Sequence, residues 1–130
     1  MFRLLMLMLA LACAGPVAPA DPSGTWKVTM EGEKKPIEGT LVLRLDGHEL
    51  TGTWSTIDEW TMKGRADDTG RFALESPSRP VPVTDGGKKS TISARWIIRG
   101  AMTDGALSGT ASIEFGDREP RIRRWSAVRK

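Results

Sequence analysis

The feature that most constrains this chain is an alternation of apolar and polar residues with period two, interrupted by glycine and aspartate turns. Trp26, Val28 and Met30, for example, share one parity, and polar residues occupy the positions between them. Successive side chains of a β-strand point to opposite faces, so this pattern is typical of half-buried strands. No stretch after residue 20 keeps a helical apolar period over three turns. Seven further segments alternate in the same way, at residues 41–45, 50–55, 60–66, 72–74, 92–99, 107–115 and 125–129.

These segments predict an all-β fold of eight strands, joined mostly by short hairpins such as Asp46-Gly47 and Asp104-Gly105. Eight antiparallel strands in sequence order can close into an up-and-down β-barrel, which leaves no exposed sheet edge. The interior of such a barrel holds either side chains or one small ligand. A two-sheet β-sandwich is the alternative architecture.

Two departures from this regular pattern are expected. Residues 76–90, SPSRPVPVTDGGKKS, contain three prolines and a Gly-Gly pair and predict a long loop. Such a loop serves either as a lid or binding loop or as a mobile connection without function. In the last strand Ile122 has the opposite parity to Trp125, which predicts a β-bulge near Arg123-Arg124.

The first 20 residues have the layout of a secretory signal peptide. Arg3 precedes an apolar run from Leu4 to Ala12, and Ala18 and Ala20 form a small-x-small cleavage site. The run is shorter than the roughly 20 residues that a membrane-spanning helix needs. We therefore expect an exported protein, periplasmic or secreted, in which residues 21–130 form a single β-barrel domain.

Cys13 gives this leader a second interpretation. It is the only cysteine of the chain, and Leu9-Ala10-Leu11-Ala12-Cys13 resembles the lipobox of bacterial lipoproteins. Lipidation of Cys13 would anchor the protein in the bacterial envelope without changing its fold. Both processing routes remain open. Residues 21–130 contain no cysteine in either case, so the domain must be stabilised by burial rather than by disulfides.

The residue inventory argues against an enzyme and against a metal or cofactor site. His48 is the only histidine, it follows the Asp46-Gly47 turn, and no second base accompanies it at a suggestive spacing. The acidic pairs Asp58-Glu59 and Asp67-Asp68 are typical of solvated loops and lack the spacing of a calcium-binding loop. No glycine-rich phosphate loop is present in the sequence.

Tryptophan is the unusual part of the composition, with five copies and no tyrosine. The parity of Trp54, Trp60 and Trp96 directs them inward, where they are our candidate ligand-binding residues for a small apolar ligand. The competing interpretation is a filled core, in which the same side chains are needed for packing.

Basic residues gather at the C-terminal end. Residues 118–130 contain six arginines and lysines and one glutamate. This strand is either a solvated face or a surface that attracts anions. Nucleic-acid binding is disfavoured, because Trp125 is the only aromatic residue there on which a base could stack.

The string Gly24-Thr25-Trp26 in the first strand and Arg129 in the last resemble the calycin superfamily, which includes lipocalins, avidins and some bacterial protease inhibitors. The resemblance implies that Arg129 stacks on Trp26 and closes one end of the barrel, a structural role worth about 0.5–2 kcal/mol. The order of short strings is similar to that of avidins, but Val28 and Thr29 stand where avidins carry a biotin-binding asparagine. Biotin binding is therefore not expected.

Two functions follow from these observations. The first is an exported barrel that binds a small apolar ligand in its interior. The alternative is a periplasmic protein-interaction module such as a protease inhibitor. The calycin resemblance implies that such an inhibitor would contact its partner through the N-terminal segment Asp21-Pro22-Ser23, although this chain lacks the disulfide usual in those inhibitors.

Overall fold

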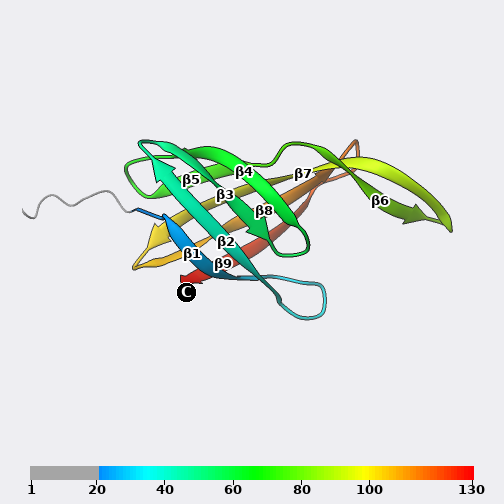
Figure 1. Cartoon of the computed structure of the whole chain (residues 1–130). Coiled ribbons are helices and arrows are strands. Elements are labelled where there is room, and N and C mark those ends of the chain that lie inside the picture. The colour runs from blue at the N-terminus through cyan, green and yellow to red at the C-terminus, as the bar shows by residue number, and fades with distance from the viewer. Residues whose placement is uncertain (1–20) are drawn as a thin grey trace, which may run out of the picture.

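The computed structural model describes residues 21–130, which form nine β-strands and no helix (Figure 1). Every strand pairing is antiparallel, and the predicted all-β class is confirmed. The strands are β1 (Gly24–Met30), β2 (Ile37–Asp46), β3 (Glu49–Ser55), β4 (Glu59–Ala66), β5 (Arg71–Glu75), β6 (Arg79–Asp85), β7 (Lys88–Thr103), β8 (Ala106–Phe115) and β9 (Arg121–Arg129).

Eight of these strands close into a barrel. The sheet order is β5-β4-β3-β2-β1-β9-β8-β7-β6, and β5 also pairs with β7 from Arg71↔Ala101 to Glu75↔Ile97. That pairing joins the two sides of the sheet and leaves β6 outside the closed barrel. The predicted eight-stranded antiparallel barrel is confirmed, and the sandwich alternative is wrong.

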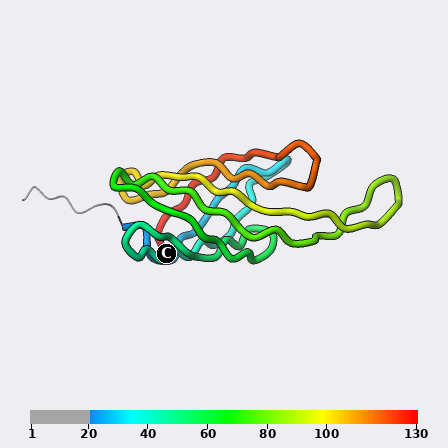
Figure 2. The backbone as a smooth tube through the Cα atoms, turned by 90° about the horizontal axis from the view of Figure 1, so that it is seen from above, coloured from blue at the N-terminus to red at the C-terminus, as the bar shows by residue number. Residues whose placement is uncertain are grey.

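The predicted loop over residues 76–90 is wrong, because most of it forms a β-hairpin. Strand β6 pairs with the first half of β7, and the hairpin projects from the barrel in both views (Figures 1 and 2). Gly86 and Gly87 have φ angles of 58° and 81° and make the two-residue turn. Pro80 and Pro82 are compatible with this strand because β6 is the edge of the sheet, where a missing N–H can face solvent.

The predicted bulge near Arg123-Arg124 is also wrong. The register of β8 with β9 runs without a skipped residue from Leu107↔Ala127 to Ile113↔Arg121. Ile122 simply points outward and is 69% exposed. Its neighbours Arg121 and Arg123 have the same inward parity as Trp125. They lie where β9 continues past its pairing with β1, so no strand covers them on that side. At these positions inward parity no longer means burial.

The barrel interior is filled by the inward faces of its strands, and all five tryptophans are buried. Glycines stand where neighbouring strands approach each other most closely. A Cβ atom on Gly64 would lie 1.7 Å from the carbonyl oxygen of Ala73, and one on Gly109 would lie 1.9 Å from that of Arg99. These positions therefore require glycine for the barrel to close.

Candidate functional site

The barrel has two different ends. We call the end that carries the turns at 46–49, 66–71 and 103–106 the closed end. The other end, which carries the loops at 31–36 and 55–59 and the β6–β7 hairpin, we call the hairpin end (Figure 1). Each end contains tryptophans, but their surroundings differ.

At the closed end, residues 21–23 are bound across the barrel. The guanidinium of Arg129 lies 4.3 Å from the Trp26 ring centroid and donates hydrogen bonds to the carbonyl oxygens of Ser23 (2.7 Å) and Asp21 (2.9 Å). The indole N–H of Trp26 donates to the carbonyl oxygen of Pro22 at 2.8 Å. The structure thus places Arg129 over Trp26, as the calycin resemblance implied.

The bound segment is held further by its own polar side chains. The Ser23 hydroxyl accepts a hydrogen bond from the Leu45 amide at 2.9 Å. Hydrogen bonds from the backbone amide and side chain of Ser23 lower the pKa of Asp21, and the positive charge of Arg129 adds to this effect. Because Asp21-Pro22-Ser23 is engaged with the barrel, these three residues are not a free tail that could enter a partner's active site.

The hairpin half of the barrel contains a cluster of aromatic rings. The ring centroid of Trp54 lies 5.8 Å from that of Trp96 and 5.6 Å from that of Trp125, the latter in an edge-on arrangement. Two of the three candidate ligand-binding residues, Trp54 and Trp96, are therefore in direct contact. The third, Trp60, lies opposite Trp54 across the β3–β4 pair. We name Trp54, Trp96 and Trp125 the tryptophan cluster.

Trp125 was not among the sequence-derived ligand-binding residues. Its inward parity was visible in the sequence, since it shares this parity with Ala127 and Arg129. In the structure it joins the cluster and also lines a surface pocket of about 270 Å³ with Met30 and Pro36. Trp125 therefore belongs both to the cluster and to the lining of this pocket.

The polar atoms of this cluster set it apart from Trp26. Within residues 21–130, the buried side-chain nitrogen and oxygen atoms without a hydrogen-bond partner are Nε1 of Trp54, Trp96 and Trp125 and Oγ1 of Thr56. Trp54 and Thr56 lie at the end of β3 next to the 55–59 loop, and the Trp125 ring contacts both Trp54 and Phe72. Leaving a buried donor unpaired costs about 1–3 kcal/mol, so a core evolved only for packing would favour phenylalanine or leucine at these positions.

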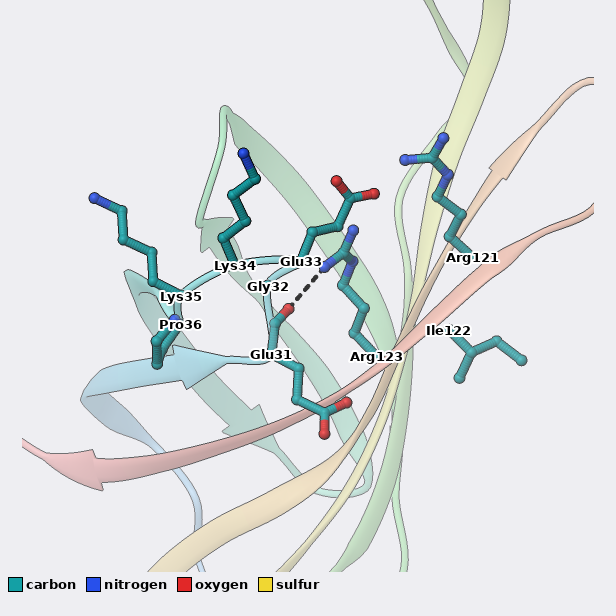
Figure 3. A pocket seen from close by; sticks show the side chains of 9 residues that line it. All are labelled: Glu31, Gly32, Glu33, Lys34, Lys35, Pro36, Arg121, Ile122 and Arg123. Atoms are coloured by element: carbon teal, nitrogen blue, oxygen red, sulfur yellow. Dashed lines mark hydrogen bonds between the residues drawn. The ribbon is translucent and has the colours of Figure 1, made fainter.

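Charged side chains surround the mouth of the hairpin end. A pocket of about 590 Å³ lies between the 31–36 loop and the start of β9 (Figure 3). Arg123 reaches from β9 to this loop and donates to the carbonyl oxygen of Glu31 at 3.0 Å. The Glu31 carboxylate in turn accepts from the Arg124 amide at 3.0 Å. The remaining charged side chains that line the pocket are Glu33, Lys34, Lys35 and Arg121.

The sheet extends beyond the mouth on one side. The inward faces of β6, β7 and β8 carry partly buried apolar residues there, namely Val81, Ile92, Ile113 and Phe115. Arg79 fixes the base of β6 to the barrel, since its guanidinium lies 3.7 Å from the Trp60 ring centroid and donates to the Glu59 carbonyl oxygen at 3.0 Å. Asp58, expected as a solvated residue, lies 3.7 Å from the same guanidinium.

The remaining candidate groups lie at the closed end. His48 Nε2 is 3.0 Å from the Asp68 carboxylate, and both side chains are exposed. Hydrogen bonds from Thr69 and from the Arg71 amide lower the pKa of Asp67, which thereby organises the β4–β5 turn. Among residues 21–130 no group of three or more His, Cys, Asp or Glu side chains is arranged to hold a metal ion. Cys13 and the predicted signal peptide lie outside the described residues.

Fold and site together define a closed antiparallel β-barrel with one strand outside it and a tryptophan-rich end beneath a basic rim. A comparison with protein-family models, with curated proteins and with solved structures finds no match to this chain. In the part of the chain that the structure describes, no helix is long and apolar enough to cross a membrane.

Proposed function

We propose that this chain is an exported binding protein that takes a small amphiphilic molecule at its hairpin end. The apolar part of the ligand packs on the tryptophan cluster, and a group that accepts hydrogen bonds meets the indole N–H donors. The observation that carries this proposal is that all three members of the tryptophan cluster bury an indole N–H without a partner in the described chain.

The path to the cluster runs past Trp125. This residue lines a pocket with Met30 and Pro36, directly beside the larger pocket under Lys34, Arg121 and Arg123. An apolar body beside Trp125 and an anionic group among these cations would match the chemistry of the lining. The purely apolar ligand expected from the sequence is therefore replaced by one with a polar or charged end.

The filled interior limits the size of the ligand. Trp54 and Trp96 are 0% and 2% exposed, so a guest can enter only if side chains near the mouth move aside. Movement at Trp125 would open a path, because this side chain packs on Trp54 and its residue also lines the surface pocket. Export and the relationship to calycins are part of the same proposal, since a leader and the Trp26–Arg129 contact are what support them.

The alternative function is a protein-interaction module. The β6–β7 hairpin favours it, because the hairpin extends from the barrel and offers a partner two faces (Figure 2). Pro80 and Pro82 interrupt the outer edge of β6, so a partner would contact a face of the hairpin rather than add a strand to it.

Native mass spectrometry of the protein purified from the exported fraction of its own cells tests the proposal. We expect an adduct of a few hundred daltons that is lost from Trp125→Phe and retained in the control Trp26→Phe. Trp125→Phe replaces the indole by a smaller aromatic ring and removes the N–H donor. An unliganded protein, or an adduct retained equally by both variants, would contradict binding at the hairpin end.

A further inference from the structure

The outer face of the barrel carries three arginines around a small depression, away from the hairpin end. Arg65 of β4 is the register partner of Ala73 of β5, and Ala73 is the register partner of Arg99 of β7. Arg71 precedes Ala73 by two residues and therefore has the same parity on β5. All three arginines line one pocket of about 590 Å³ whose floor includes Ala73 and Gly100.

The spacing allows the three guanidinium groups to meet. Adjacent strands lie about 4.8 Å apart, which places the Cα atoms of Arg65 and Arg99 on the order of 10 Å from each other. An arginine side chain is long enough to cover half of that distance. The methyl group of Ala73 between them leaves the space above the sheet unfilled.

The charges of this cluster are only partly balanced by the protein, since Glu49 is the register partner of Arg65 and the positive charge of Arg71 helps to lower the pKa of Asp67. Within residues 21–130, none of the three guanidinium groups takes part in an ion pair or a side-chain hydrogen bond. The two carboxylates that line the same pocket also have partners outside the cluster. Asp67 accepts from the amide and hydroxyl of Thr69, and Asp68 lies 3.0 Å from His48.

The three arginines outnumber the two carboxylates that line the same depression, so the depression carries a net positive charge that attracts anions. An anion that enters the depression would neutralise part of this positive charge. Guanidinium groups donate paired hydrogen bonds in a planar fork that matches the oxygens of phosphate, and three of them suit a doubly charged tetrahedral oxyanion better than a single carboxylate.

We propose that Arg65, Arg71 and Arg99 form a binding site for a phosphate group. The site is separate from the hairpin end and does not depend on the function proposed there. The phosphate group belongs either to a small solute or to the headgroup of an anionic lipid, and both sources present the same chemistry to the three arginines.

The test compares Arg99→Gln with Arg44→Gln in the protein with residues 21–130. Both substitutions remove one exposed positive charge, but Arg44 lies on β2 and is not part of the lining of the depression. In one arm, inorganic phosphate is titrated and backbone amide shifts are followed by NMR. In the other, the protein is sedimented with phosphatidylcholine vesicles containing phosphatidic acid.

We expect wild type to respond in at least one arm, with the amide shifts or the pelleting identifying a soluble or a lipid source. Loss of one charge-assisted contact should weaken Arg99→Gln about tenfold, whereas Arg44→Gln should stay within about twofold of wild type. Arg71→Gln should repeat the effect of Arg99→Gln. No response in either arm, or equal weakening by Arg99→Gln and Arg44→Gln, would overturn the site.

Discussion

The two ends of the barrel bury tryptophan in opposite ways. Trp26 at the closed end and Trp54 in the hairpin half are both 0% exposed, so burial alone does not distinguish them. The N–H of Trp26 is bonded to Pro22 at 2.8 Å, whereas the N–H of Trp54 has no partner in the described chain. The difference teaches that hydrogen-bond satisfaction, rather than burial, distinguishes Trp26 from the tryptophans of the proposed ligand site.

The same contrast extends to what covers each end. The closed end is covered by residues 21–23 of its own chain, held by Arg129 and by the Leu45 amide. The hairpin end is bordered by the 31–36 loop and the start of β9, whose lysine and arginine side chains line a pocket. Both ends use arginines to hold their own loops, but only the tryptophan cluster leaves buried indole N–H groups without a partner in the described chain.

The largest expected effect is common to both ends. Trp26→Ala and Trp54→Ala should each lower the free energy of unfolding by about 3–5 kcal/mol, because each removes a fully buried indole. Urea unfolding followed by circular dichroism measures this loss. A cost below about 1 kcal/mol for Trp54→Ala would show that the hairpin half is not a packed core and would break the comparison.

Arg129 should give the next largest effect, confined to the closed end. Arg129→Gln removes the contact with Trp26 and the paired donors to Ser23 and Asp21, which should cost about 1–3 kcal/mol of unfolding free energy. Arg129→Lys keeps the charge but not the planar fork, so it should recover less than half of the loss. Full recovery of the unfolding free energy in Arg129→Lys would mean that the positive charge, and not the planar guanidinium, stabilises the closed end.

Much of this architecture could be predicted from the sequence, because strand parity is a local property. The inward positions of Trp54, Trp60 and Trp96 follow from alternation alone, and all three are buried. The Asp104-Gly105 turn is confirmed as a two-residue hairpin turn with positive φ at both residues, 54° and 81°. Turns that require a left-handed backbone can thus be predicted from the sequence, because few residue types adopt that conformation.

The parts that failed depend on tertiary context. Pro80 and Pro82 indicated a loop, since the sequence does not reveal that β6 is an edge strand. The parity of Ile122 indicated a bulge, since the sequence does not reveal where β9 leaves β1. The unpartnered N–H of Trp125 depends on which acceptors the neighbouring strands supply, and no local pattern records that.

The conservative replacement of tryptophan by phenylalanine should separate the ends at smaller amplitude. Trp26→Phe and Trp125→Phe lose similar volume, but only Trp26→Phe loses a hydrogen bond. We therefore expect Trp26→Phe to be the less stable variant by about 1–2 kcal/mol in the absence of ligand. Equal unfolding midpoints in urea would mean that the Nε1 of Trp125 finds an acceptor in solution.

The smallest effect should be the dependence of the closed end on pH. The pKa of Asp21 is lowered in the folded protein by the hydrogen bonds from Ser23 and the charge of Arg129, so its ionised form favours the folded state. This stabilisation is fully present above the unfolded pKa of about 3.9 and is lost as the pH falls through the lower folded pKa. Asp21→Asn keeps an acceptor oxygen but not the charge. Urea midpoints of wild type and Asp21→Asn should therefore differ at pH 6 and converge toward pH 2, and a difference that does not change with pH would exclude the carboxylate charge as its cause.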